Sequence, residues 1–405
     1  MLIEHLNQQR LEREAQGLLR HRRMTQGPCT PRQEVVDAAG VTRAQLSFCS
    51  NDYLGLANHP TLTQALIEGA RRWGAGSGAS HLVSGHTRAH AELEDALAAW
   101  MAPHIPHVQA LSFSTGFMAN LALLTTLGTT QTTLFADKLN HASLIDGALL
   151  AQAKLQRYAH RQFNVLERQL AACTTPLKLI VTDAVFSMDG DVAELDTLLA
   201  LAERFDAWLV VDDAHGFGVL GPRGRGALAH FNLCSERLIY MGTLGKAAGL
   251  AGAFVAAHAT VIDALVQTGR SYIYTTAAPP ALAHALRVSL DLIQSDDGQW
   301  RRAHLSNLIT SLRQQLSALI AQHPHLGWTL MESTTAIQPL VVGSNATAIA
   351  LAQTLEEQGL WVPAIRPPTV PAGRARLRIS LSAAHSHGDV KQLMDALTYA
   401  AQTRP

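Results

Sequence analysis

The sequence has little charge, few cysteines and no long apolar run. Charged residues make up 16% of its 405 residues and hydrophobic residues 47%, whereas charged residues usually reach about a quarter. This composition excludes intrinsic disorder, which needs low hydrophobicity and high charge. Lysine plus arginine and aspartate plus glutamate number 32 each, so the formal net charge is zero. No global positive field is available to bind nucleic acid or an anionic membrane.

The cysteines and the N-terminus point to a reducing compartment. None of the four cysteines is spaced as a metal knuckle or a CxxC pair, so no disulfide scaffold and no metal site is expected. The N-terminus is charged and lacks the apolar core of a signal peptide. The longest apolar run, residues 247–257, is well short of a bilayer span. The sequence therefore predicts a cytoplasmic protein without a membrane or nucleic-acid partner.

Buried strands alternate with helical patterns between about residues 105 and 257. The intervening helices are expected at 117–127, 143–153 and 195–205. This alternation predicts a mostly parallel sheet covered on both faces. Ligands of such sheets lie beyond the carboxyl ends of the strands. The expected strands are HVQALSF, TLFAD, KLIVTDAVF, WLVVDDA, RLIYMG and GAFVAA.

The flanking regions differ from this α/β part. Leucines at roughly helical spacing predict an amphipathic helix over residues 2–24. A long helical stretch at about 280–322 precedes a small α+β unit, which contains IQPLVVG, WVPAI, RLRISLS and helices at about 345–359 and 387–402. We expect an N-terminal helix and connector at 1–48, a large domain at 49–290 and a small C-terminal α+β domain at 291–405.

Lys246 differs from the other four lysines. It lies in MGTLGKAAG, among small residues just past the strand RLIYMG. An amine in a glycine-rich loop at a strand end can form a Schiff base if its pKa is lowered. The alternatives are a phosphate-binding lysine and an ordinary loop lysine, although the segment lacks the Walker spacing.

Two adjacent carboxylates end the strand in LVVDDAHG. Alternation along the strand places the side chains of Asp212 and Asp213 on opposite faces. A buried carboxylate needs a partner, and a protonated pyridine nitrogen is the partner in pyridoxal phosphate enzymes. The alternatives are a metal site, for which only His215 is in local reach, and a helix N-cap role for Asp213.

Other polar groups follow neighbouring strands. Gly116 in FSTGFMAN begins a helix whose backbone N–H groups attract phosphate. His141 in DKLNHASL and Ser187 in VFSMDGD also lie past strands, and a neutral imidazole can stack on a flat ring. Each signal alone is modest, and a histidine at a strand end is more often simply hydrogen-bonded in place. Together these groups suit an aromatic, phosphorylated, electron-withdrawing cofactor.

Eight ordered motifs resemble one known family. They are SNDYLGLANHP, STGFMAN, DKLNHASL, VFSMDGD, VVDDAHGFGVLG, GTLGKAAG, IYTTAAPP and IRPPTVPAGRARLRISLSAAH. The chain resembles the α-oxoamine synthases from about residue 18 to 400. These are pyridoxal phosphate enzymes of the aspartate-aminotransferase fold (fold type I), which condense an amino acid with an acyl-CoA and release CO2. The resemblance implies a mostly parallel seven-stranded sheet, pyridoxal 5'-phosphate as cofactor, and a homodimer with the active site at the subunit interface.

The resemblance also implies roles for individual residues. Lys246 is the Schiff-base lysine, Asp212 pairs with the pyridine nitrogen and His141 stacks on the ring. His215 and Ser187 contact the side of the ring that carries the phenolic oxygen. The implied phosphate ligands are Gly116, Phe117 and Thr243, with Thr275 and Thr276 reaching the phosphate of the neighbouring subunit.

The tail motif most resembles the member of the family that condenses L-alanine with a pimeloyl thioester of CoA or of a carrier protein. Arg366 with Asn51 and Thr369 is then implied to bind the amino acid carboxylate, since the arginine fork suits a carboxylate. Arg20 matches an arginine near the far carboxylate of the acyl chain, with Arg22 and Arg23 next to it.

Three alternatives stay open. Sister enzymes that use glycine, 2-amino-3-oxobutyrate CoA ligase or 5-aminolevulinate synthase, have nearly the same cofactor motifs. A phosphate- or nucleotide-binding protein on a doubly wound fold would lack Schiff-base chemistry. A non-catalytic subunit, like those paired with serine palmitoyltransferase, is opposed by the intact Lys246, Asp212 and His141. The chain also departs from the family pattern at Asp183, where Glu is expected, and at Ala79, where Gly is usual.

Overall fold

The computed structural model describes residues 1–37 and 39–403, which form two compact units. The large unit comprises Leu54–Ser187 and Val192–Arg302. The small unit comprises Met1–Tyr53, Met188–Asp191 and Ala303–Pro405, so the N-terminal and C-terminal segments share one unit. The domain boundaries expected from the sequence stay a prediction.

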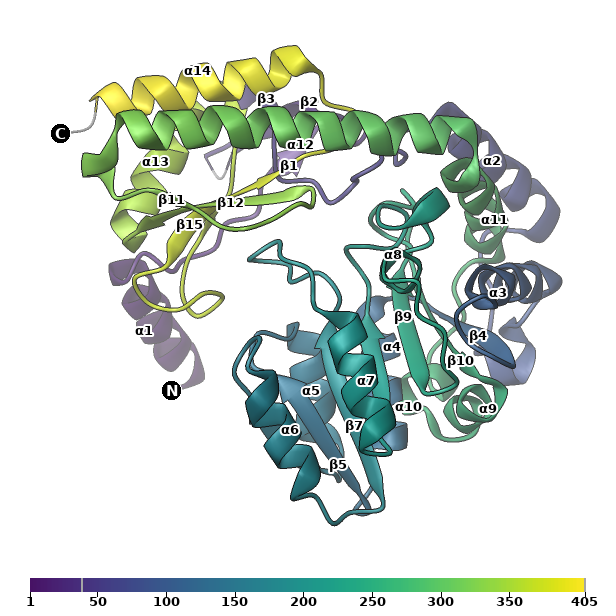
Figure 1. Ribbon diagram of the computed structural model, residues 1–405. Helices are drawn as coiled ribbons and strands as arrows, with labels where there is room; N and C mark the ends of the chain where they lie inside the picture. Colours follow the sequence, from purple (N-terminus) through teal and green to yellow (C-terminus); the bar gives the residue numbers. More distant parts are fainter. Residues whose placement is uncertain (38, 404–405) are drawn as a thin grey trace. The chain divides into compact units, whose positions relative to one another are not determined.

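A seven-stranded sheet forms the centre of the large unit (Figure 1). Its strand order is β4-β10-β9-β8-β7-β5-β6, and within it β10 runs antiparallel to both of its neighbours. The pairs β9–β8, β8–β7, β7–β5 and β5–β6 are parallel, so their carboxyl ends meet at one edge. The strands are β4 (Val108–Phe113), β5 (Thr132–Asp137), β6 (Lys154–Tyr158), β7 (Leu177–Asp183), β8 (Trp208–Asp212), β9 (Leu238–Thr243) and β10 (Ala253–His258).

Helices cover both faces of this sheet, with α7 on one face and α4 on the other (Figure 1). The long helical stretch expected at 280–322 is two helices that break at Ser295. The helices are α2 (Pro60–Trp73), α3 (Arg88–Met101), α4 (Gly116–Leu127), α5 (Ala142–Leu150), α6 (Phe163–Ala171), α7 (Leu195–Arg204), α8 (Ala227–His230), α9 (Ala259–Thr268), α10 (Arg270–Ile273), α11 (Pro280–Gln294) and α12 (Asp296–Gln322). The boundary to the small unit falls within α12. The large unit also contains a π-helical turn (His81–Gly85) and a 3-10 turn (Pro222–Gly224).

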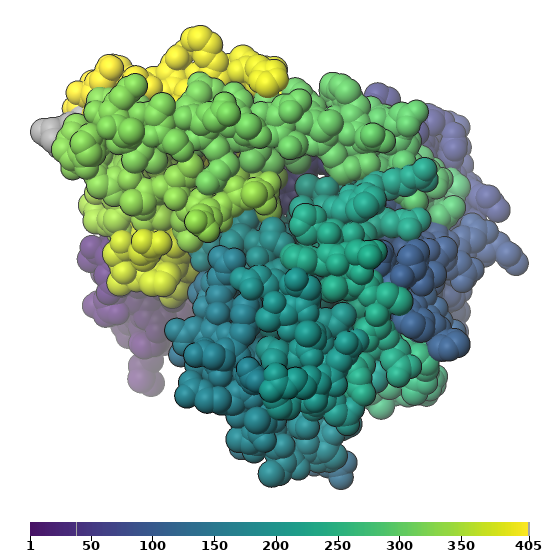
Figure 2. All heavy atoms as spheres, in the orientation of Figure 1, coloured from purple at the N-terminus to yellow at the C-terminus, as the bar shows by residue number. Residues whose placement is uncertain are grey.

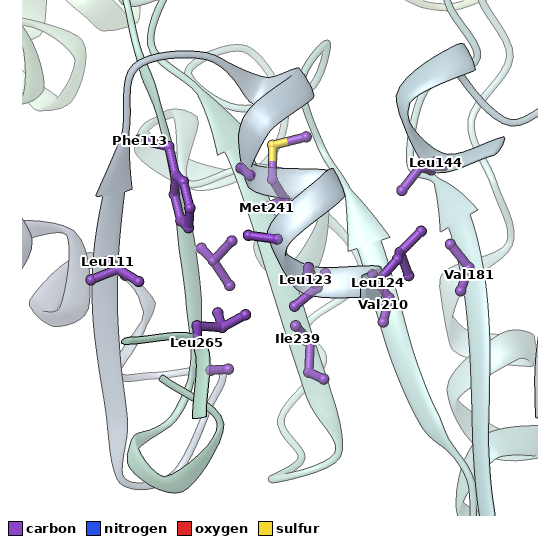
Figure 3. Packing of buried hydrophobic residues seen from close by; sticks show 14 of the residues in the cluster. Leu111, Phe113, Leu123, Leu124, Leu144, Val181, Val210, Ile239, Met241 and Leu265 are labelled. Carbon is purple, nitrogen blue, oxygen red and sulfur yellow. The ribbon is translucent and has the colours of Figure 1, made fainter. Parts of the chain in front are cut away.

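The core beneath α4 positions the edge where the strands end. Leu123 and Leu124 of α4 pack with Val210 of β8 and Ile239 of β9, and all four side chains are fully buried (Figure 3). Burying each of these side chains contributes about 1.5–3 kcal/mol. This packing holds the first turn of α4 at the carboxyl ends of the parallel strands.

Two smaller sheets belong to the small unit. One has the order β1-β2-β3-β13, with β3 and β13 parallel, and the other has the order β11-β12-β15-β14, with every pair antiparallel. The elements are α1 (Leu2–Ala15), β1 (Met24–Thr25), β2 (Arg32–Val36), β3 (Thr42–Ser47), a 3-10 turn (Pro324–Leu326), β11 (Thr329–Leu330), β12 (Ile337–Gly343), α13 (Asn345–Glu357), β13 (Leu360–Trp361), β14 (Ala364–Ile365), β15 (Ala375–Ser380) and α14 (His387–Thr403).

The first helix is shorter than its leucine pattern predicts. Helix α1 ends at Ala15, and none of its residues is buried, so its side chains cover part of the surface in Figure 2. Gly17 follows with a φ of 64°, and the N–H of Leu18 donates to the carbonyl of Arg13 at 2.7 Å. This left-handed glycine closes the helix. The predicted helix to residue 24 is therefore wrong, and Arg20 lies beyond the helix rather than within it.

The remaining elements follow the sequence pattern closely. All six expected strands and the three expected helices between them are present, with ends shifted by a few residues. Strand β6 was not expected, because its residues are mostly polar and only Tyr158 is fully buried. The predicted mostly parallel seven-stranded sheet is confirmed. Among the described residues, no helix is both long and apolar enough to cross a membrane.

Candidate active site

Three neighbouring parallel strands bring polar side chains to one edge and one face of the large sheet. Asp183 at the end of β7 lies opposite Asp212 at the end of β8, and Asp212 lies opposite Met241 of β9. Thr243 follows two residues after Met241, so its side chain shares that face. Met241 belongs to the core under α4. Asp183, Asp212 and Thr243 therefore lie on the face that α4 covers.

Asp212 is held by donors from two directions. Its Oδ2 accepts a hydrogen bond from the amide Nδ2 of Asn120 on α4 at 2.7 Å, and its Oδ1 accepts one from the backbone N–H of Ala214 at 3.0 Å. The side chain is buried, which makes these bonds to a carboxylate strong. Asn120 was not singled out in the sequence, although it stands in the motif FSTGFMAN.

Asp213 points to the other face and has different partners. Its Oδ2 accepts hydrogen bonds from the hydroxyl of Tyr240 at 2.7 Å and from the N–H of Ala227, the first residue of α8, at 2.6 Å. Burial and, to a lesser extent, the neighbouring Asp212 raise the pKa of Asp213 while its hydrogen bonds lower it, and the net result is a pKa of about 7. The predicted opposite orientation of the two carboxylates is confirmed. Asp213 thus anchors the start of α8, and the backbone N–H of Gly216, in the segment that follows β8, also acts on its carboxylate.

Lys246 lies in a tight loop between β9 and β10. Its Nζ is 3.0 Å from Nε2 of the buried His215. The N–H of Gly249 donates to the carbonyl of Lys246 at 2.9 Å. Gly249 has a φ of 72°, and a Cβ there would lie 2.6 Å from the backbone of Leu56. Glycine is required at that position because the chain passes so close, and the resulting turn aims the lysine at His215.

The loop before α5 fixes His141 by both its backbone and its ring. The N–H of His141 donates to Oδ2 of Asp183 at 2.7 Å, and the amide of Asn140 donates to the carbonyl of Val181 at 2.8 Å. The imidazole Nδ1 caps α5 by accepting from the N–H of Ser143 at 3.2 Å. Partial burial lowers the pKa of His141, and Lys246 lowers it further, while Asp212 raises it.

Asp183 supports His141 and is itself buried. Burial and the nearby Asp212 raise the pKa of Asp183 well above its ordinary value, while the bond from His141 and the charge of Lys246 lower it. The shorter aspartate thus reaches the backbone of the histidine loop. Ala79, the other departure from the family pattern, is not among the residues with positive φ, so alanine causes no backbone strain there.

The start of α4 forms a cradle next to Thr243. Thr115 caps the helix by accepting from the N–H of Met118 at 3.2 Å. A Cβ at Gly116 would lie only 2.8 Å from Cγ2 of Thr243, so glycine permits the close approach. The first N–H groups of a helix have no partner within the helix and attract anions. Gly116, Phe117 and Thr243 therefore suit a phosphate group.

Thr275 and Thr276 belong to the large unit but lie on a separate segment. Thr276 forms an isolated β-bridge with Ser80, and the N–H of Ala277 donates to the carbonyl of Ala79 at 3.0 Å. Thr276 is exposed. Neither threonine has a described hydrogen bond to the groups at the strand ends. Ser187 follows β7 and ends the first segment of the large unit.

The expected substrate-binding residues all belong to the small unit. A guanidinium nitrogen of Arg366 donates to the carbonyl of Gly17, and Arg20 and Thr369 are exposed. Oδ1 of Asn51 accepts from the hydroxyl of Tyr53 at 3.1 Å and from two guanidinium nitrogens of Arg378, each at 3.3 Å.

Arg378 is buried and was missed from the sequence. One of its guanidinium nitrogens also donates to Oγ of Ser380 at 2.7 Å. A buried cation beside a predicted substrate ligand is itself a candidate ligand for a carboxylate. Its position within the strand RLRIS gave the only hint, because an arginine in an otherwise buried strand needs a reason.

No group of three or more histidine, cysteine, aspartate or glutamate side chains in the described part of the chain suits a metal ion. The polar groups at the strand ends are one amine, two imidazoles and the carboxylates around them. This donor set matches a cofactor with a carbonyl carbon, a basic ring nitrogen and a phosphate.

The chain belongs to the aminotransferase class I and II family, which residues 43–397 match. It is 73% identical to the 8-amino-7-oxononanoate synthase of Leptothrix cholodnii over 99% of both chains. The solved 8-amino-7-oxononanoate synthase (bioF) from Francisella tularensis is 32% identical with a TM-score of 0.75, covering 88% of this chain and 98% of that one. A serine palmitoyltransferase from S. paucimobilis with bound PLP and myriocin is 27% identical with a TM-score of 0.88, covering 98% and 97%. The predicted fold and family resemblance are confirmed.

Proposed function

We propose that the chain is a pyridoxal-phosphate-dependent acyltransferase. It condenses L-alanine with a pimeloyl thioester, giving 8-amino-7-oxononanoate, CO2 and the free thiol carrier, a step of biotin biosynthesis. The observation that supports the proposal is that Lys246 and Asp212 belong to one site. The charges of both side chains shift the pKa values of His141 and Asp183. The chain is in addition 73% identical to an 8-amino-7-oxononanoate synthase. Phosphate binding alone would not require this amine beside this carboxylate.

The residues at the strand ends fit pyridoxal 5'-phosphate. Gly116, Phe117 and Thr243 would hold its phosphate, and Asp212 its protonated ring nitrogen. His141, Ser187 and His215 would contact the ring, and Lys246 its reactive carbon. When bound, the cofactor supplies an electron sink for a carbanion at the α-carbon of the amino acid.

The protein side chains then bind the substrates and move a proton. Lys246 Nζ takes the proton from the α-carbon of alanine, and His215, 3.0 Å away, keeps the amine close to the reacting atom. Asn120 and Ala214 donate to the two carboxylate oxygens of Asp212 and would orient this carboxylate toward the ring nitrogen of the cofactor. Arg366 with Asn51 and Thr369 binds the α-carboxylate of alanine, and Arg20 binds the far carboxylate of the pimeloyl group.

The active unit is a homodimer. Thr275 and Thr276 reach the phosphate of the neighbouring subunit. Support comes from exposed apolar side chains on the same segments, since Tyr274 is 72% and Val83 78% exposed. Such residues gathered around one bridge between two segments favour a partner surface. The acyl carrier is CoA or a carrier protein, and the protein works in the cytoplasm.

The testing experiment offers alanine, glycine and serine in turn with pimeloyl, succinyl and acetyl thioesters and identifies the products by mass. The proposal expects 8-amino-7-oxononanoate from alanine and the pimeloyl thioester as the most efficiently formed product. Preferred use of glycine with an acetyl or succinyl thioester would assign the chain to a sister enzyme. In the same assay, Arg366→Ala should raise the KM for alanine and Arg20→Ala the KM for the thioester, each about ten- to a hundredfold.

A further inference from the structure

The side-chain amide of Asn120 connects two parts of the candidate site. Asn120 is completely buried, and its Nδ2 donates to Oδ2 of Asp212 at 2.7 Å and to Oγ of Ser143 at 2.8 Å. Oγ of Ser143 lies 2.7 Å from Nδ1 of His141. An unbroken chain of hydrogen bonds therefore runs from Asp212 to His141.

The chemistry of these groups fixes the direction of every bond. A carboxylate oxygen accepts from an amide NH2 group, so Asn120 presents this group to Asp212. The second amide hydrogen then occupies a lone pair of Ser143 Oγ, whose own hydrogen is free to point at His141 Nδ1. The backbone N–H of Ser143 also donates to this Nδ1, at 3.2 Å. Nδ1 is thus an acceptor, and a neutral His141 carries its proton on Nε2.

We propose that Asn120 is a positioning residue that orients the Asp212 carboxylate and, through Ser143, holds His141 in the Nε2–H tautomer. His141 then presents a hydrogen-bond donor through Nε2, and Nδ1 takes no part as a base. The role of the bond from Asn120 to Asp212 rests on the proposed function, because this bond orients the carboxylate that would pair with the ring nitrogen. The role of the bonds from Asn120 through Ser143 to His141 does not depend on the proposed function.

The surroundings of His141 agree with a neutral ring. Partial burial lowers the pKa of His141, and the charged groups that act on it are Asp212, Lys246 and Asp146. Asn120 Oδ1 has no hydrogen-bond partner among the described residues. Both hydrogens of the Asn120 amide are therefore bonded within the site, to Asp212 and Ser143, while the amide oxygen has no described partner. A buried oxygen without a hydrogen bond lowers the stability of the fold. We attribute its presence here to the orientation of Asp212 and Ser143.

The test compares Asn120→Ala and Ser143→Ala with Ser112→Ala as a matched control. Ser112 is also buried, and its hydroxyl donates to Glu94 at 2.6 Å rather than to Asn120, Asp212 or His141. The first readout is the nitrogen NMR spectrum of the His141 ring in cofactor-free protein, assigned by comparison with His141→Gln. The second is the dissociation constant of pyridoxal 5'-phosphate, and thermal melting checks that each variant is folded.

The unchanged chain should show His141 as the Nε2–H tautomer. Asn120→Ala and Ser143→Ala should both raise the fraction of the Nδ1–H tautomer, because the hydroxyl donor to Nδ1 is released or removed and only the longer backbone bond at 3.2 Å remains. Asn120→Ala should also weaken cofactor binding about ten- to a hundredfold, the usual effect of losing a bond to a charged group. Ser143→Ala should leave the affinity within about threefold, since its bond is to a neutral partner. Ser112→Ala should change neither readout.

An Nδ1–H tautomer in the unchanged chain would contradict the proposed role of Asn120 toward His141. An unchanged affinity for pyridoxal 5'-phosphate in Asn120→Ala would contradict its proposed role toward Asp212. If Asn120→Ala does not fold, the unchanged chain and Ser143→Ala still decide the tautomer. If alanine and the pimeloyl thioester are not substrates while the tautomer shifts as expected, the proposed function fails and the role of Asn120 toward His141 stands.

Discussion

The two faces of the sheet at the end of β8 treat adjacent carboxylates in opposite ways. Asp212 is oriented by a side-chain amide that continues to Ser143 and His141. Asp213 is enclosed instead, since a Cβ on Gly216 would lie 2.1 Å from its Oδ1 and one on Gly226 2.4 Å from its Oδ2. Asp212 is therefore placed for chemistry, while the adjacent Asp213 stabilises the fold. The space and the hydrogen-bond donors around each carboxylate determine which of these roles it has.

Asp212→Asn should have the largest effect on turnover. The substitution keeps the shape but removes the charge that pairs with the ring nitrogen, so kcat should fall about a hundred- to a thousandfold. The melting temperature should change little. Steady-state kinetics and thermal melting check both statements. An equal loss of kcat in Asp213→Asn would erase the distinction between the two faces.

Asp213→Asn should act on stability and its pH dependence. The folded chain raises the pKa of this carboxyl from 3.8 to about 7, so it binds the proton more tightly than the unfolded chain. The stabilisation is complete below pH 3.8 and is lost as the pH rises toward 7, by at most about 4 kcal/mol.

An asparagine can accept from Tyr240 and Ala227 as Oδ2 does now, and it cannot ionise. The variant should therefore gain stability over the unchanged chain as the pH rises from 5 to 8, in denaturant unfolding at each pH. The exposed Asp263→Asn is the control and should show no such trend. A variant whose stability falls with pH in parallel to the unchanged chain would show that Asp213 is not the titrating group.

Gly216→Ala should have the smallest of the three effects. The added methyl would meet Asp213 Oδ1 and also Cδ1 of Leu220 at 2.9 Å, so the loop must shift. We expect a loss of about 1–3 kcal/mol in the free energy of unfolding. Gly245→Ala is the control, because the nearest atom to its Cβ is 3.8 Å away. Equal losses in both variants would mean that the space around Asp213 is not the cause.

The sequence was informative where backbone geometry alone places a side chain. Alternation along VVDDAH was enough to put Asp212 and Asp213 on opposite faces, because a strand has a fixed period of two. The small residues around Lys246 likewise marked a tight loop at a strand end. Such features depend only on local sequence and on the rule that parallel strands share an edge.

Other features depend on neighbours that are distant in the sequence. Asn120 sits within a helix, and only packing of α4 on the sheet shows that its amide meets Asp212 and Ser143. Helix α1 ends where Gly17 takes a left-handed conformation. The sequence-based prediction followed the spacing of the leucines and gave this glycine no weight. Arg378 lies in a strand whose burial arises from tertiary packing. Periodicity cannot report such contacts.

On the face of the sheet that carries Asp212, pyridoxal 5'-phosphate is expected to be bound through Lys246. The most direct measurement is to reduce the yellow protein with borohydride and to map the modified peptide by mass spectrometry. One adduct is expected, on Lys246, and none in the Lys246→Ala variant. An adduct on one of the other lysines, at positions 138, 154, 178 and 391, or no adduct on a protein that contains the cofactor, would contradict this expectation.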